Sequence, residues 1–114
     1  MTDSQVPKNA PYTVTSSMDG QVGIIALAGS VGMDDEERIL SAYRTVTTSG
    51  ARLIRLLFMP GTTINSSGIA LLITMTSQAK KSRQKVEVAG LSPHYRKIFD
   101  MIGLTQYVKI VEKE

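Results

Sequence analysis

The residues with the clearest chemical potential are two serines, Ser66 and Ser67, followed directly by Gly68. They come after an apolar run at 52–59 and open a segment with helical character, so both hydroxyls should lie at a helix N-terminus. A hydroxyl there is exposed, and the backbone N–H groups around it would stabilise an anion such as a phosphate. Ser66 could also cap the helix by accepting a hydrogen bond from an N–H of the first turn. The two roles are compatible.

Other reactive side chains give little support for catalysis. The chain has no cysteine and one histidine, His94, which excludes thiol nucleophiles and multi-histidine metal sites. Ser67, His94 and Asp100 supply the residue types of a hydrolase triad, but the Gly-x-Ser-x-Gly elbow that would hold the nucleophile is missing. No lysine follows Gly68, so a phosphate-binding P-loop is missing as well. We therefore predict a protein that is not an enzyme and needs no cofactor or metal.

The 114-residue chain has the size and composition of one globular domain, with 42% apolar and 20% charged residues. Its net charge of +3 is too small to indicate a nucleic-acid partner. No apolar run is long enough to span a membrane, and residues 1–10 are polar and lack the features of a secretory signal. We expect a cytoplasmic protein with a flexible tail at 1–10 and a single domain at 11–114.

Apolar runs alternate with amphipathic segments along the chain, which is typical of an α/β fold. Strands are expected at 12–16, 22–28, 52–59, 86–89 and 107–111, and helices at 35–48, 66–82 and 93–102. The turn at 18–21 should join the first two strands into an antiparallel hairpin, and 29–32 should end the second strand. The prediction is a mixed, mostly parallel sheet of four or five strands packed with three helices.

The second helix has more apolar positions than one sheet-facing stripe requires. Leu71 and Met75 are expected outside that stripe, either covered by a neighbouring helix or exposed as an apolar strip for a partner protein. The positions expected to face the sheet are Ile69, Leu72, Ile73 and Ala79.

The loop that contains Ser30, Gly32 and Met33 follows a strand expected to run parallel to the strand before the serines. Both segments should then lie at the carboxyl end of the sheet, where parallel sheets gather their binding sites. We predict that a partner protein binds there. The residues assigned to this surface are Asn65, Gly68, Leu71, Met75, Ser30, Gly32 and Met33.

Two segments of the chain resemble a known family. The first is Phe58 with the turn Ile64-Asn65-Ser66-Ser67-Gly68-Ile69, and the second is 90–104, Gly-Leu-Ser-Pro-His-Tyr-Arg-Lys-Ile-Phe-Asp-Met-Ile-Gly-Leu. Together with the order of the elements they look like the STAS domain, and they are most similar to the bacterial anti-sigma factor antagonists. The resemblance runs from about Tyr12 to Val111.

In that family an Asp-Ser-Ser/Thr-Gly turn carries a regulatory serine. An anti-sigma factor with serine kinase activity phosphorylates it, a metal-dependent Ser/Thr phosphatase removes the phosphate, and the dephosphorylated form binds the anti-sigma factor and so frees the sigma factor. By position, the resemblance implies Ser66 as the phosphorylated residue and Ser67 as the second choice. We expect a monomer or weak dimer that regulates transcription through these protein partners, with no nucleic acid or membrane among them.

Two positions depart from the family pattern. Asn65 stands where the family usually has Asp, and Gly-Ser-Val-Gly at 29–32 replaces the usual Gly-Glu-Leu-Asp. Acidic groups beside the phosphate acceptor are therefore lost. These departures favour an alternative function, a non-phosphorylated STAS scaffold or regulatory module in a signalling or transport assembly.

Overall fold

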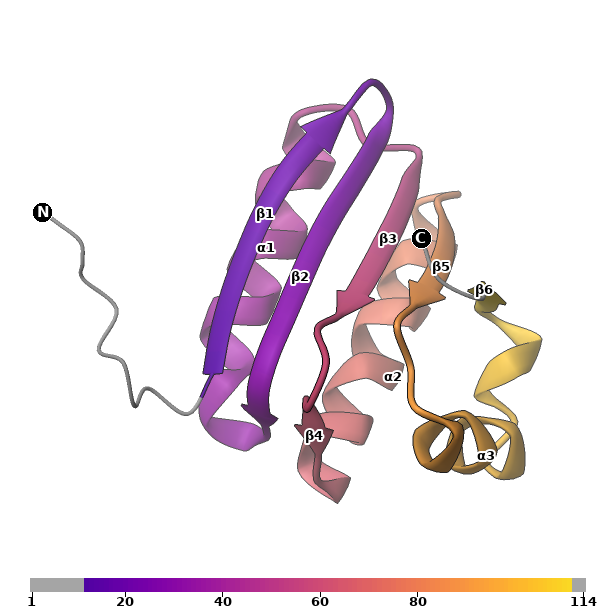
Figure 1. The fold of residues 1–114 in the computed structure, drawn as a ribbon. Helices are drawn as coiled ribbons and strands as arrows, with labels where there is room; N and C mark the ends of the chain where they lie inside the picture. Colours follow the sequence, from indigo (N-terminus) through magenta and orange to yellow (C-terminus); the bar gives the residue numbers. More distant parts are fainter. Residues whose placement is uncertain (1–11, 112–114) are drawn as a thin grey trace, which may run out of the picture.

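The computed structural model describes residues 12–111, and the tail predicted at 1–10 lies outside them. Strands and helices alternate after an initial hairpin (Figure 1). The strands are β1 Tyr12–Asp19, β2 Val22–Val31, β3 Leu53–Phe58, β4 Thr63–Ile64, β5 Lys85–Ala89 and β6 Lys109–Val111. The helices are α1 Glu36–Thr48, α2 Ser66–Lys81 and α3 Pro93–Met101, with 3₁₀ turns η1 Met33–Asp35 and η2 Leu104–Gln106.

The sheet has the predicted mixed topology. Its strand order is β1-β2-β3-β5-β6, in which β1 is antiparallel to β2 and the other neighbours are parallel. The three runs predicted for the interior of the sheet, β2, β3 and β5, occupy that interior. Their alternate side chains are buried, as period-2 burial on one face requires.

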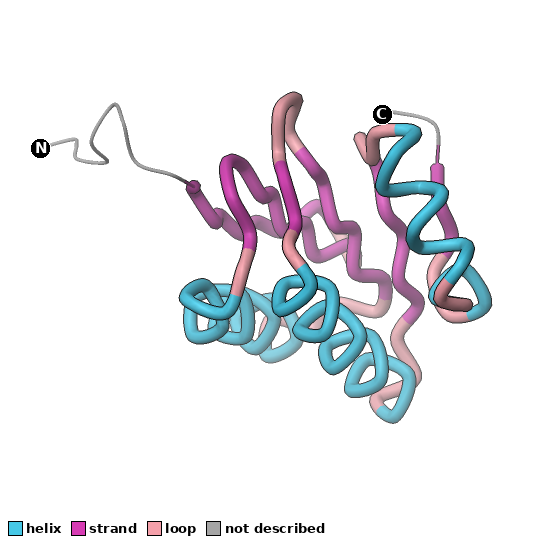
Figure 2. The backbone as a smooth tube through the Cα atoms, turned by 90° about the horizontal axis from the view of Figure 1, so that it is seen from below, coloured by secondary structure: helices cyan, strands magenta, loops and turns pink. Residues whose placement is uncertain are grey.

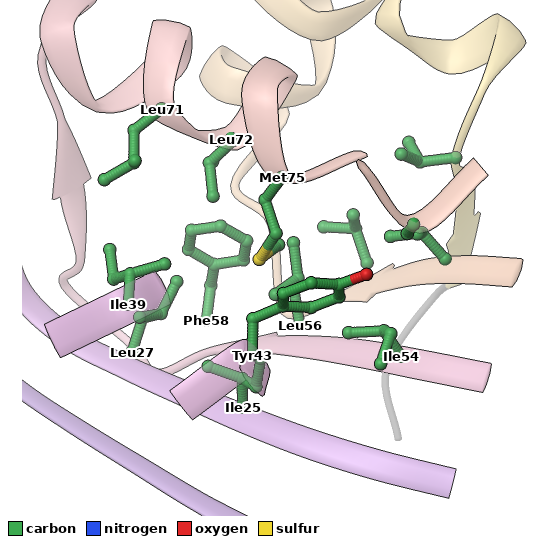
Figure 3. Packing of buried hydrophobic residues seen from close by; sticks show 14 of the residues in the cluster. Ile25, Leu27, Ile39, Tyr43, Ile54, Leu56, Phe58, Leu71, Leu72 and Met75 are labelled. Carbon is green, nitrogen blue, oxygen red and sulfur yellow. The ribbon is translucent and has the colours of Figure 1, made fainter. Parts of the chain in front are cut away.

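Two helices, α1 and α2, lie against the same face of the sheet, as the view in Figure 2 shows. Between helices and sheet lies one apolar core, to which α1 contributes Ile39 and Tyr43 (Figure 3). Tyr43 carries the polar atom of this layer, and its hydroxyl donates to Gln84 Oε1 at 2.6 Å. Gln84 Nε2 in turn donates to Thr47 and to the carbonyl of Ala51, so this buried network is satisfied.

The second strand is three residues longer than the predicted 22–28 and includes most of the segment 29–32 that was expected to break it. β2 continues to Val31 because Ser30 and Val31 pair in parallel with Thr63 and Ile64, which form the unpredicted strand β4. Two residues are too short a run to show a strand period, so β4 left no signal in the sequence. The pairing holds the end of β2 beside the segment that leads into α2.

The expected apolar strip on α2 is absent, because Leu71 and Met75 are core residues with 7% and 0% exposure. Both side chains point into the space between helix and sheet (Figure 3). Ile73, predicted to face the sheet, is instead 44% exposed. The buried face was misplaced because Gly68 and Thr76, which belong to it, are not hydrophobic residues. The buried positions of α2 are Gly68, Leu71, Leu72, Met75, Thr76 and Ala79, which follow a helical spacing of three and four.

Candidate functional site

The N-terminus of α2 is bound closely to the end of β2. The amide of Asn65 donates to the carbonyl of Val31 at 3.1 Å. Gly68 lies over the same carbonyl, and a Cβ added to Gly68 would come within 2.6 Å of the Val31 oxygen. Any larger residue at 68 would push the helix away from the strand. The serine turn is therefore fixed to the sheet by contacts that require glycine.

Asn65, and not Ser66, caps α2. Its backbone is extended and its side-chain Oδ1 accepts from the amide of Gly68 at 2.8 Å. Its carbonyl accepts from Ile69 at 2.9 Å, which closes the first turn. The expectation that Ser66 accepts a capping hydrogen bond was wrong, because the asparagine one position earlier makes it. The Ser66 hydroxyl is left without a capping role.

The two serines occupy different environments. Ser66 is the first residue of α2 and is exposed, whereas Ser67 is half-buried. Backbone N–H groups at the first positions of a helix have no helical carbonyl to bond, so they leave a partial positive charge there. A negative group on Ser66 would meet that positive end. Ser66 is therefore the more exposed of the two serines.

Gly32 is enclosed by the asparagine cap. A Cβ at position 32 would lie 2.6 Å from Asn65 Nδ2 and 3.1 Å from Asn65 Oδ1. The amide of Gly32 donates to Asp35 Oδ2 at 2.8 Å, and its carbonyl accepts from the amide of Asp35 at 3.0 Å. Asp35 is 2% exposed, so this acid holds the loop from inside. Asp35 also occupies the N-cap position of α1, but its side chain makes no capping hydrogen bond to that helix.

Further predicted residues lie in the same region. Ser30 and Thr63 bring their hydroxyl oxygens to 3.1 Å of each other on the exposed side of the β2–β4 pair. Met33 begins η1, which follows directly from Gly32. The structure therefore brings the loop and the serine turn together at the carboxyl end of the sheet. Whether they bind a partner stays a prediction, and Leu71 and Met75 are not on the surface.

A residue that sequence reasoning missed connects α3 to this site. The Tyr95 hydroxyl accepts a hydrogen bond from the amide of Ile64 at 3.0 Å. The partly buried ring of Tyr95 is packed against the core. The helix is positioned by Ser92, whose hydroxyl accepts from the Tyr95 amide at 3.3 Å, as its Ser-Pro start predicted. The polar end of a core tyrosine gives no separate signal in a sequence.

The described part of the chain, 12–111, contains no group of three acidic or histidine side chains placed to hold a metal ion. No helix among those residues is long and apolar enough to cross a membrane. His94 is exposed and contacts the ring of Tyr95 edge-on at 4.9 Å between centroids. The site therefore consists of an exposed hydroxyl at a helix start, a tightly packed loop beside it, and small polar groups around both.

Several solved structures have the same fold. Similar structures include SpoIIAA of Bacillus in the phosphorylated form (TM-score 0.66, 19% identity, 90% of this chain and 92% of that chain covered). The anti-sigma factor antagonist SpoIIAA in its unphosphorylated form has a TM-score of 0.70 at 16% identity, with 90% of each chain covered. An anti-sigma factor antagonist from Mycobacterium paratuberculosis has a TM-score of 0.67 at 16% identity, with 87% of this chain and 84% of that chain covered. The fold is that of SpoIIAA-type anti-sigma factor antagonists.

The family follows from the sequence itself. The chain belongs to the STAS domain family, because the family model described as "Mlab, STAS domain" matches residues 14–112. No curated protein sequence matches the chain. The predicted resemblance to the STAS domain is thus confirmed.

Proposed function

We propose that this protein is a cytoplasmic anti-sigma factor antagonist that acts by binding, not by catalysis, and that phosphorylation of Ser66 switches the binding. The observation that carries the proposal is the exposed Ser66 hydroxyl at the first position of α2, which the Asn65 cap leaves available. The phosphorylated and unphosphorylated SpoIIAA structures share this fold. The partners would be an anti-sigma factor of the serine kinase type and a metal-dependent Ser/Thr phosphatase.

The switch would work through charge at an interface. A phosphate adds about −1.5 to −2 charge at pH 7. Within the domain the positive end of α2 accommodates this charge, so the fold should change little. At a close interface formed by Asn65, Ser30 and Gly32, the same charge must be desolvated or must oppose acidic groups of the partner. A penalty of ~3 kcal/mol would weaken binding by roughly a hundredfold.

The direct test is incubation of the full chain with ATP and a purified anti-sigma factor of the serine kinase type from the same organism, followed by phosphopeptide mapping. We expect label on Ser66. Ser66→Ala should abolish labelling and bind the kinase constitutively, whereas the matched Ser67→Ala should be labelled normally. Exclusive label on Ser67, or no label with a kinase that modifies a known substrate, would refute the switch at Ser66.

A second function is favoured by the packing of Asn65 against Gly32. The side-chain amide of Asn65 occupies the space above Gly32. The contact leaves no room for a side chain at position 32, and neither residue has a carboxylate. A non-phosphorylated STAS module, which serves as a scaffold or regulator in a signalling or transport assembly, needs none. In that case Ser66→Ala and Ser66→Asp would assemble with the partner as well as the unaltered protein does, and the kinase assay would give no label.

A further inference from the structure

The longer of the two edge strands that border the sheet of the described residues is β1. This strand has eight residues and pairs on one side with β2, and it ends the sheet order among the described residues 12–111. It lies at the border of the sheet, next to α1 (Figure 1). The opposite border is β6, which has only three residues and begins with Lys109. An edge strand presents a row of N–H and C=O groups that can pair with another strand.

The central part of β1, from Val14 to Met18, lacks the usual features that prevent such pairing, and the one charged residue of the strand, Asp19, is its last. From Val14 to Met18 the strand has no charged residue and no proline. Its register with β2 is continuous from Tyr12 opposite Gly29 to Asp19 opposite Val22, so no bulge turns the edge away. Ser and Thr side chains fill the exposed positions, and these are compatible with strand pairing.

A groove beside the strand would receive the side chains of an added strand. It is a hollow of about 350 Å³ between β1 and α1. Val14 and Met18, on the face of β1 that looks towards α1, are half-buried and packed against the core. The residues that line the groove are Val14, Ser16, Glu37, Arg38, Ser41, Ala42 and Thr45.

The strand is complementary to itself. Two copies related by a two-fold axis perpendicular to the sheet pair in an antiparallel way. Residues that lie opposite each other in such a pair point to the same face of the sheet. The axis must therefore lie midway between the two copies of one residue, which is then opposite itself. With the axis at Ser16, Val14 lies opposite the partner's Met18, and Thr15 lies opposite the partner's Ser17. An apolar pair forms on the groove face and a hydroxyl pair on the other, both favourable cross-strand combinations.

The helix below the edge adds charge complementarity. Glu37 and Arg44 lie on one exposed face of α1, with their side chains 88% and 61% exposed and 3.6 Å apart. Glu37 also lines the groove, so this face of α1 looks towards the edge. The same two-fold axis places the two α1 helices antiparallel, which brings Glu37 of each copy towards the partner's Arg44. Opposite charges then face each other across the axis.

We propose that a second copy of this chain occupies the β1 edge and forms a symmetric dimer with one continuous sheet centred on Ser16. One strand pair and one helix contact make an interface at the small end of stable sizes, so monomer and dimer should exchange with concentration. The edge is separate from the N-terminus of α2, which packs on the other side of α1 (Figure 2). Both Ser66 sites would stay accessible, and the dimer does not depend on the proposed switch.

The sharpest test places a charge at the two-fold axis by substitution of Ser16. Sedimentation equilibrium of the full chain measures the dimer dissociation constant. Ser16 is exposed, and in the proposed dimer it lies opposite itself. Ser16→Lys and Ser16→Glu should each raise the dimer dissociation constant at least tenfold, because two like charges meet. An equimolar mixture of the two variants should recover the dimer as a heterodimer. Ser77→Lys, the same change on the exposed side of α2, should dissociate like the unaltered protein.

The recovery in the mixture separates loss of the interface from loss of folding, since unfolded chains would not recover. A protein that remains monomeric over the accessible concentration range overturns the proposal. So does a dimer that both single variants leave intact, or one that the mixture fails to restore. A monomer that instead binds an extended peptide along β1 would show that the edge has a different occupant, and it would also overturn the proposal.

Discussion

The side-chain amide of Asn65 rests directly on the backbone of Gly32, so close that a Cβ at position 32 would lie 2.6 Å from Asn65 Nδ2. Two of the positions at which this chain departs from the family pattern, 32 and 65, are therefore in contact. Glycine at 32 leaves the space in which the capping amide of α2 lies. The departures at these two positions are one structural arrangement and not independent losses of an acid.

That contact predicts a coupled response to substitution. Gly32→Ala should lower the free energy of unfolding by about 1–3 kcal/mol, because the methyl group displaces the cap. Asn65→Ala should lower it by about 1 kcal/mol through loss of the bond to Gly68. In the double variant the methyl group at position 32 has no amide to displace. The loss of unfolding free energy in the double variant should therefore be smaller than the sum of the losses in the two single variants. Urea denaturation of the four proteins measures this, and strict additivity would contradict the contact.

Asn65→Asp restores the charge that the family carries beside the phosphate acceptor. Aspartate caps a helix as well as asparagine does. Its negative charge at the helix N-terminus should stabilise the helix by about 0.3–1 kcal/mol. We expect unchanged or slightly higher stability, together with a several-fold faster initial rate of Ser66 phosphorylation by the cognate kinase. Asn65→Ser, a neutral cap, is the control and should leave the rate low. Equal rates for Asp and Ser at this position would show that the charge does not matter to the kinase.

Ser66→Asp should reproduce part of the effect of phosphorylation. It adds one negative charge where the phosphate adds about −1.5 to −2, so binding of the anti-sigma factor should weaken by roughly tenfold and not a hundredfold. The melting temperature should stay within a degree or two of the unaltered protein, because the charge meets the positive end of α2. Calorimetric titration measures the affinity. A large loss of stability would instead place the Ser66 side chain in the packing of the turn.

Much of the fold could be predicted from local patterns, and each exception has a physical reason. The runs at 22–28, 52–58 and 86–89 are apolar because these strands lie between other strands and one face of each is buried in the core, and Ser92-Pro93 is a typical helix start. Strand β4 arises from a pairing between distant segments, 30–31 and 63–64. The buried role of Asp35 depends on the compact turn at 32–35, where its carboxylate accepts from the amide of Gly32, and a run of acidic residues does not show which one is buried. The buried face of α2 was misjudged because Gly68 is buried for close approach to Val31 and not for its hydrophobicity.

The buried face of α2 can be tested with a matched pair of substitutions. Met75 is 0% exposed and Ile73 is 44% exposed, although they lie two positions apart on one helix. Met75→Ala should lower the free energy of unfolding by about 2–5 kcal/mol, because it leaves a cavity in the core. Ile73→Ala should change it by no more than about 0.5 kcal/mol. Similar losses for both would mean that α2 is rotated from the orientation described.

Tyr95 should hold the segment before the serines in place from α3. Its hydroxyl accepts a hydrogen bond from the Ile64 amide at 3.0 Å, although the two residues are 31 positions apart in the sequence. Tyr95→Phe keeps the ring in the core and removes only this acceptor, so the free energy of unfolding should fall by about 1 kcal/mol. Hydrogen exchange should show a faster Ile64 amide, while the amides of α1, which Tyr95 does not bond, exchange as before. If the Ile64 amide keeps its protection in Tyr95→Phe, the segment is held by its pairing with β2 alone.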